Sequence, residues 1–259
     1  MKWDPRKYTQ FSSHRDRPFF DLTARIEADA PRRVVDLGCG PGTLTAALAA
    51  RWPEARVTGV DSSAEMVEQA GALEGAPANL EFVRGGIEEW EPQPGTDVVV
   101  SNAALQWVPG HQDLMRRWAK QLDAGAWLAV QVPGNFGAPS HALMRELAAS
   151  AAWSDKLDGV LRHADAVDEP EDYLGLLTEA GFDADVWETS YSQVLQGEDP
   201  VLEWVRGTAL RPVIAALDPE DFGRFEAEYA ALLREAYPQH AWGTVFPFRR
   251  IFMVGRKKG

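Results

Sequence analysis

Three glycines at every second position, Gly38, Gly40 and Gly42, follow directly on an apolar run and precede a segment typical of a helix. Glycine has no Cβ, so a ligand can approach the backbone closely, and it adopts positive φ readily. At a turn from strand to helix, such a loop is typical of a nucleotide site. Taken alone, a tight turn that binds nothing would explain the loop as well.

The spacing of these glycines narrows the class of ligand. A dinucleotide site needs G-x-G-x-x-G, but the sixth position counted from Gly38 is Thr43. The Gly-Lys-Ser/Thr of a P-loop is absent as well. The loop therefore favours a nucleoside ligand that carries no phosphates, and a nicotinamide-dependent oxidoreductase is disfavoured.

Two acidic residues flank this loop. Asp61 closes the next apolar run, 19 residues beyond Gly42. A carboxylate at that position can accept two hydrogen bonds from a ribose diol, which suits an adenosine ligand. Asp36, just ahead of the glycines, could accept from an ammonium group. Together with Asp61, the loop favours a ligand site over a plain turn.

Strand and helix patterns alternate in the segments that must position these residues. We expect strands at residues 32–38, 55–61, 80–86, 96–105 and 126–133, and helices at residues 43–52, 62–73 and 111–122. The spacing of Ser62 and Glu65 predicts a capping box that opens the second of these helices. Alternation with short connections predicts an α/β fold, in which helices cover both faces of a mostly parallel sheet.

The remainder of the chain adds a helix, two strands and a helical block. Asp199-Pro200 and Asp218-Pro219 each predict a helix start in that block, because Asp caps helices and Pro suits the first turn. The block is typical of a cap over a site, although a packed side layer fits the pattern too. We expect a single domain, residues 1–259, made of an N-terminal cap segment (1–30), a ligand-binding core (31–195), a helical cap insertion (196–242) and a last strand (243–259).

Composition excludes several classes of function. The net charge of −13 argues against a nucleic-acid partner. Cys39 is the only cysteine, which excludes an intramolecular disulfide and a zinc site built from cysteines. No apolar run approaches the roughly 20 residues that span a bilayer, and the N-terminus lacks the apolar region of a secretory signal. These features predict a cytoplasmic protein without a metal or a membrane partner.

The motifs resemble those of the class I S-adenosylmethionine-dependent methyltransferases. The run VVDLGCGPG is similar to their first motif, VTGVDSS with Asp61 to their second, and DVVVSNAALQWV lies where their fourth strand meets the methionine end of the donor. The resemblance covers about residues 32–195. It implies a Rossmann-like, seven-stranded, mostly parallel sheet with a reversed last strand, and S-adenosyl-L-methionine as the methyl donor.

The resemblance also implies which residues contact the donor. They are Asp36, Gly38, Gly40, Asp61, Ser62, Asn102 and Ala103. Many relatives place an Asp after the third strand to accept from the adenine amino group, but Gly86 stands there in this chain. The resemblance therefore leaves the adenine contact to the backbone around Ile87 or to Glu88.

The acceptor decides what catalysis must add. An amine or hydroxyl needs a base, whereas a carboxylate with a pKa of about 4 is already ionised and needs only alignment. The run SNAALQW lacks the Asp/Asn-Pro-Pro-aromatic motif of enzymes that methylate amino groups in nucleic acids. The histidines are scattered along the chain, so no general base is assigned.

A second, narrower resemblance spans nearly the whole chain and is to the methyltransferases that esterify trans-aconitate. It rests on WDPRKYTQFSSHRDRP, NAALQWVPGH, QVPGNFGAPSH, ALRP and FPFRRIFMV. Because guanidinium forks bind carboxylates in pairs, arginines suit such a small anionic substrate. The candidate substrate-binding residues are Tyr8, His14, Arg15, Arg211, Arg249 and Arg250, with Arg211 and Arg250 ranked first. A surface salt bridge would explain any single arginine equally well.

Two other functions remain open from the sequence alone. The acceptor could be another small carboxylic acid or a hydroxyl metabolite. The chain could also bind the donor as a sensor without transferring its methyl group. The preference among aconitate isomers and the oligomeric state are not predicted.

Overall fold

The computed structural model describes residues 12–161 and 166–259, without the side chains of residues 12–15. The contacts of the chain divide it into two compact units. The sheet unit comprises Ser13–Pro133, Asp168–Glu188 and Arg250–Gly259. The helical unit comprises Gly134–Val167 and Thr189–Arg249, as far as these ranges are described.

One mixed sheet has the strand order β3-β2-β1-β4-β5-β8-β6, and β7 pairs with β8 beside this path. Its strands are β1 (Arg33–Leu37), β2 (Arg56–Asp61), β3 (Leu80–Arg84), β4 (Thr96–Asn102), β5 (Trp127–Pro133), β6 (Phe182–Leu195), β7 (Gln239–His240) and β8 (Gly243–Lys257). The pairs among β1–β5 are parallel, whereas β8 runs antiparallel to β5. This confirms the predicted mostly parallel sheet with a reversed last strand.

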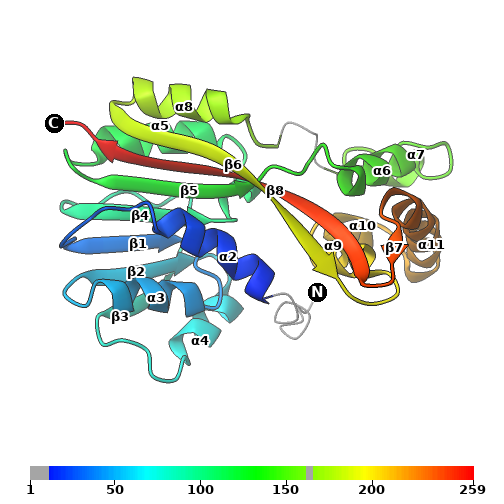
Figure 1. Ribbon diagram of the computed structural model, residues 1–259, viewed down its shortest axis with the longest axis horizontal. Helices are drawn as coiled ribbons and strands as arrows, with labels where there is room; N and C mark the ends of the chain where they lie inside the picture. Colours follow the sequence, from blue (N-terminus) through cyan, green and yellow to red (C-terminus); the bar gives the residue numbers. More distant parts are fainter. Residues whose placement is uncertain (1–11, 162–165) are drawn as a thin grey trace. The chain divides into compact units, whose positions relative to one another are not determined.

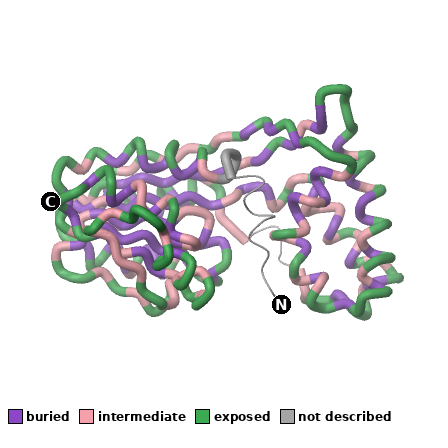
Figure 2. The backbone as a smooth tube through the Cα atoms, turned by 90° about the horizontal axis from the view of Figure 1, so that it is seen from below, coloured by how far each residue is buried: buried purple, intermediate pink, exposed green. Residues whose placement is uncertain are grey.

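The helices and one short 3₁₀ turn of the sheet unit cover its strands on two sides. They are α2 (Ser12–Thr23), α3 (Thr43–Arg51), α4 (Ala64–Gly71), η1 (Leu105–Trp107), α5 (His111–Gln121) and α8 (Pro170–Glu179). Figure 1 shows α2 and α3 in front of the strands and α5 behind them. Burial on both faces explains the continuous apolar runs of β1, β4 and β5. Figure 2 shows buried stretches in the interior of this unit and exposed ones around them.

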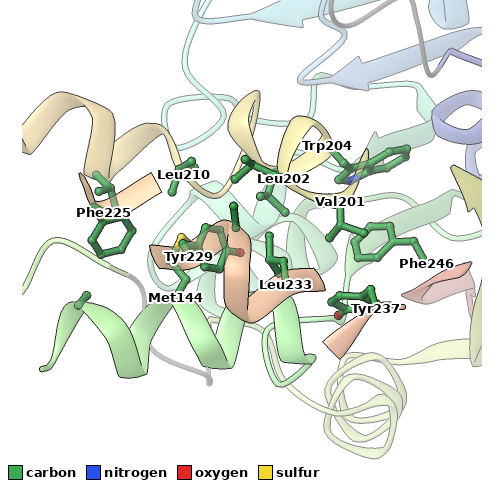
Figure 3. Packing of buried hydrophobic residues seen from close by; sticks show 14 of the residues in the cluster. Met144, Val201, Leu202, Trp204, Leu210, Phe225, Tyr229, Leu233, Tyr237 and Phe246 are labelled. Carbon is green, nitrogen blue, oxygen red and sulfur yellow. The ribbon is translucent and has the colours of Figure 1, made fainter. Parts of the chain in front are cut away.

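The helical unit has its own hydrophobic core. Its helices are α6 (Pro139–Ala148), α7 (Ser154–Leu157), α9 (Pro200–Arg206), α10 (Arg211–Ala216) and α11 (Pro219–Ala236). The apolar face of α11 is buried, with Phe225, Tyr229 and Leu233 at most 3% exposed. Figure 3 shows these side chains gathered with those of α6 and α9. The Tyr229 hydroxyl also donates to the Ser140 carbonyl, which ties α11 to α6.

Side chains were predicted to cap three helices, at Ser62, Asp199 and Asp218. Only the cap at Asp218 is confirmed. At α11, Asp218 accepts from the backbone N–H of Glu220 and Asp221, as predicted. The Asp199 carboxylate does not cap α9, because it binds the guanidinium of Arg234 at 2.7 and 2.6 Å.

The capping box predicted at Ser62 and Glu65 is wrong. The N-cap of α4 is Ser63, whose side chain accepts from the Met66 N–H. The physical reason is the Asp61 carboxylate, which accepts from the Ser63 N–H at 2.9 Å and holds a local turn before the helix begins.

Candidate functional site

The glycine loop continues β1 alongside β2 in the sheet unit. The backbone N–H groups of Gly38 and Cys39 both donate to the Val60 carbonyl, at 2.8 and 3.1 Å. The values of φ are 79° at Gly38, 54° at Gly40 and 80° at Gly42. All three lie in the left-handed region that glycine adopts without the steric cost of a Cβ.

The three glycines are nevertheless required for different reasons. A Cβ at Gly38 would lie 2.3 Å from the Ala104 Cβ, and one at Gly42 would lie 2.4 Å from the Phe82 ring. Nothing lies within 4 Å of the corresponding position at Gly40. Packing within the protein therefore explains the absence of a side chain at Gly38 and Gly42, and only Gly40 faces open space. This refines the expectation that all three glycines clear room for a ligand.

Asp61 lies beside the loop and helps to hold it in place. Its Oδ2 accepts from the Gly40 N–H at 2.9 Å, and its Oδ1 accepts from the Ser63 N–H at the same distance. Each carboxylate oxygen has two lone pairs, so Asp61 retains capacity for a ligand diol. Ser62 is exposed next to it, and its carbonyl accepts from the Arg84 guanidinium at 3.3 Å.

Asp36 is a buried carboxylate at the end of β1. It is 3% exposed, and the Thr45 hydroxyl donates to its Oδ2 at 2.7 Å. Burial raises the pKa of Asp36 from 3.8 to about 6, the hydrogen bond from Thr45 opposes this shift, and the charge of Asp61 adds to it. A ligand cation placed beside Asp36 would favour the ionised form. The site therefore suits an ammonium group.

Strained backbone directly follows β4, the strand that neighbours β1. Among the described residues, Ala103 is the one non-glycine residue with positive φ, at 55°. Two hydrogen bonds hold it: its N–H donates to the Gln131 carbonyl at 2.9 Å, and its carbonyl accepts from the Gln106 side chain at 2.6 Å. Strain of this kind costs about 1–3 kcal/mol and clusters at functional sites.

Two further predicted donor contacts lie in the same unit. The Asn102 Oδ1 is covered and has no hydrogen-bond partner in the described part of the chain. Such an orphan acceptor suits a ligand donor, since covered polar groups are otherwise paired. The Ile87 side chain lies 3.5 Å from the position of a Cβ on Gly38, which places the segment after β3 beside the glycine loop. The structure thus brings Asp36, Gly38, Gly40, Asp61, Ser62, Ile87, Asn102 and Ala103 together in one unit.

The predicted substrate residues are divided between the units. Arg250 belongs to the sheet unit, is 5% exposed, and donates from Nη1 to the Gln131 side-chain oxygen at 3.4 Å. Arg211 and Arg249 belong to the helical unit, Arg211 exposed at the start of α10 and Arg249 donating to the Gly134 carbonyl at 3.3 Å. Tyr8 and the side chains of His14 and Arg15 lie outside the described residues.

Gln131 was not among the predicted site residues. It is fully buried in β5 and lies between the backbone contact to Ala103 and the side-chain contact to Arg250. One signal could have found it, because it is the single polar residue in the apolar run WLAVQVP.

Within residues 12–161 and 166–259, we find no second reactive centre near the glycine loop. Cys39 is buried, and burial raises the pKa of its thiol far above the ordinary range, so it is a poor nucleophile. His111 is buried and its Nε2 lies 2.7 Å from the Tyr173 hydroxyl, which joins α5 to α8. In the parts of the chain that are described, no cluster of His, Cys, Asp or Glu could hold a metal, and no helix could span a membrane.

A cavity of about 480 Å³ lies on the opposite face of the sheet from Asp36. Val35, Thr58 and Glu81 line it from neighbouring strands, and side chains alternate along a strand, so Asp36 points to the other side. Arg56 and Glu81 in its wall already pair at 2.9 Å. This cavity is therefore separate from the glycine-loop site.

Comparisons with known proteins agree with the fold. Residues 34–125 match the model of a methyltransferase domain family. The YcgJ protein of Bacillus subtilis has a similar solved structure, with a TM-score of 0.59 at 16% identity over 94% of this chain and 99% of that one. At this identity the likeness bears on the fold alone.

Sequence relatives extend over the whole chain. A trans-aconitate 2-methyltransferase of Rhodococcus jostii is 56% identical over 98% of this chain and 99% of its own length. A protein of the same name from Streptomyces coelicolor is 55% identical over 98% of this chain and 86% of its own length. Relatives this similar over nearly all of both chains share a family. The chain therefore belongs to the trans-aconitate 2-methyltransferase family.

Proposed function

We propose that this protein transfers the methyl group of S-adenosyl-L-methionine to one carboxylate of trans-aconitate, giving the monomethyl ester and S-adenosylhomocysteine. The observation that carries the proposal is the 56% identity to a trans-aconitate 2-methyltransferase over 98% of the chain. That identity extends well beyond residues 34–125, the part that matches a general methyltransferase domain. It therefore includes segments outside the glycine-loop region, to which we assign the acceptor.

We propose a role toward the donor for each candidate residue of the sheet unit. Asp36 and the orphan Oδ1 of Asn102 accept from the ammonium group of the methionine end. Gly40 leaves room for that end to approach the backbone, and Asp61 accepts from the ribose diol through its remaining lone pairs. Ile87 borders the adenine. When bound, the donor supplies a methyl group on a sulfonium, which is already activated for transfer.

Backbone groups of the same loops complete this set. Ser62 follows Asp61 and would contact the ribose, and Ala103 would present its strained peptide to the methionine end beside Asn102. Gly38 keeps the loop next to Ala104, where a Cβ would not fit. In this proposal the protein binds a preformed electrophile and adds no cofactor beyond the donor.

The acceptor carboxylate is ionised near neutral pH, so we propose no general base. The residues instead align the anion and remove its water, which is catalysis by proximity. Arg250 and Arg211 are the first choices to bind its carboxylates, with Arg249, Tyr8, His14 and Arg15 as further contacts. In this proposal the whole chain acts as one methyltransferase domain.

A methyltransferase for another small carboxylic acid or a hydroxyl metabolite is the alternative within the same fold. The proposal also includes a cytoplasmic location and no nucleic-acid partner. The net charge of −13 supports the second point, because it opposes a phosphate backbone.

A mass-spectrometric assay with the donor and a panel of di- and tricarboxylates tests the activity. A methyl ester formed fastest from trans-aconitate is the expected result. If S-adenosylhomocysteine binds but no acid is esterified, the proposal that the acceptor is a carboxylic acid is contradicted. Hydroxyl acceptors would then be tested. Binding of the donor with no transfer to either class would indicate a sensor.

Arginine variants test the substrate site separately from the donor site. Arg250→Ala and Arg211→Ala should lower turnover of trans-aconitate at least tenfold while S-adenosylhomocysteine still binds, because each charge-assisted pair is worth about 1.5–3 kcal/mol. Arg250 is buried, so Arg250→Lys serves as a variant that keeps the charge but not the planar fork. Arg116→Ala is the control, since Arg116 is exposed and pairs within α5 with Asp113. Unchanged turnover in both alanine variants contradicts the assignment.

A further inference from the structure

Gln131 has an unusual environment for an amide side chain. It lies in β5, is 0% exposed, and its Nε2 has no hydrogen-bond partner within the described residues. Covered polar atoms are almost always paired, so an unpaired one points to a missing partner. An N–H₂ group can only donate, and the missing partner must therefore be an acceptor.

The strand register places the Gln131 amide on the same face of the sheet as Asp36. Gln131 pairs with Asn102 across β4 and β5, and Asp36 pairs with Val100, two residues before Asn102. In β8, Phe252 lies opposite Gln131 and Arg250 lies two residues away. Because side chains alternate along strands, Asp36, Asn102, Gln131 and Arg250 share one face of the sheet.

Chemistry fixes which end of the Gln131 amide points where. A guanidinium has donors and no acceptor, so the end near Arg250 must be the oxygen. The Arg250 Nη1 donates to this Oε1 at 3.4 Å. The Gln131 Nε2 therefore points away from that contact. It is a hydrogen-bond donor on the same face of the sheet as the Arg250 guanidinium.

We propose that Gln131 determines specificity by donating from Nε2 to a carboxylate oxygen of the acid substrate, beside Arg250. This inference rests on the proposed function, in which the acceptor is a small carboxylic acid. A carboxylate can accept from an amide and a guanidinium together. A neutral amide also suits the site better than a glutamate would, since a second anion would repel the substrate.

Two substitutions separate this role from a structural one. Gln131→Met removes the donor and should raise KM for trans-aconitate about 10- to 150-fold, the range for a hydrogen bond to a charged group. Gln131→Glu keeps an acceptor for Arg250 but replaces the donor by a negative charge, so its KM should rise further. In both variants the Kd for S-adenosylhomocysteine should change less than about threefold.

The matched control is Gln93→Glu. Gln93 is exposed in the same unit and accepts from Arg33 at 2.9 Å, so it undergoes the same chemical change next to an arginine. Its KM should equal that of the wild type. Thermal unfolding adds a readout, because Gln131→Glu keeps the acceptor for Arg250 and should unfold within a few degrees of the wild type.

Each outcome decides the question. An unchanged KM in both variants overturns the proposal and leaves Gln131 a structural residue or the partner of a buried water. A weaker Kd for S-adenosylhomocysteine with unchanged KM assigns Nε2 to the donor's own carboxylate and overturns it too. If the wild type esterifies no acid, the proposed function fails separately, and calorimetric binding of trans-aconitate to wild type and Gln131→Glu then tests the contact itself, with equal binding contradicting it.

Discussion

Asp36 allows the strongest test of the donor site. Because its carboxylate is buried, its ionised form should lower the free energy of unfolding. Its pKa is about 6 in the folded protein and 3.8 as an ordinary carboxyl, a difference of about 2 units. A raised pKa means that the folded protein holds the proton more tightly than the unfolded chain. Stability is therefore lost as the pH rises from about 4 through 6, and the full loss is of the order of 3 kcal/mol above that range.

Asp36→Asn removes this cost and keeps an oxygen for the Thr45 hydroxyl. At pH 8 we expect the variant to be more stable by up to about 3 kcal/mol, which corresponds to a rise in Tm of about 6–12 °C for a chain of this size. At pH 5 the gain should be about half as large, and it should disappear below about pH 4. Scanning calorimetry of both proteins across this range measures it.

The same substitution should weaken donor binding, because the amide offers the ammonium group no charge. Calorimetric titration with S-adenosylhomocysteine at pH 8 should give a Kd about 10- to 150-fold higher than that of the wild type. A variant that is less stable at pH 8 by the same amount as at pH 5 would refute the burial argument.

Asp97→Asn provides a control of opposite sign. Arg32 binds both oxygens of the Asp97 carboxylate, at 2.9 and 2.7 Å, and holds the pKa of Asp97 below its ordinary value. A carboxyl whose pKa is lowered by folding stabilises the protein at pH values above its ordinary pKa. This stabilisation is lost as the pH falls through the pKa of the folded protein. Asp97→Asn should therefore lower Tm at pH 8, whereas Asp36→Asn raises it.

Two more predictions concern the glycine loop. Gly38→Ala should cost about 2–5 kcal/mol of unfolding free energy, from positive φ and the overlap with Ala104, whereas Gly40→Ala should cost only about 1–2 kcal/mol from φ. Urea unfolding measures both variants, and equal losses of unfolding free energy would contradict the packing argument. Gly40→Ala should nevertheless weaken S-adenosylhomocysteine binding. Iodoacetamide at pH 8 should leave Cys39 unmodified in the folded protein and modify it in guanidinium, as mass spectrometry would show, because burial raises the pKa of the thiol. Rapid alkylation of the folded protein would contradict this.

Local patterns were enough to predict the sheet. A sheet covered on both faces requires apolar strands. The apolar runs of β1, β2, β4 and β5, with helices between them, are visible in the sequence of each segment. The position of Asp61 after β2 is also local information. Helix α2 was not predicted, because Pro18 lies inside it and proline removes a helix hydrogen bond. Its burial of Phe19 and Leu22 against the rest of the unit offsets that signal.

The sequence by itself determined the donor-type loop, the order of the strands along the chain and the acidic residues that end them. Only the tertiary structure decided why each glycine is needed, since Ala104 and Phe82 are distant in sequence from Gly38 and Gly42. It also decided the raised pKa of Asp36 and the place of Gln131 beside Arg250. Burial and register join residues from different strands, and no spacing along one chain segment encodes those distances.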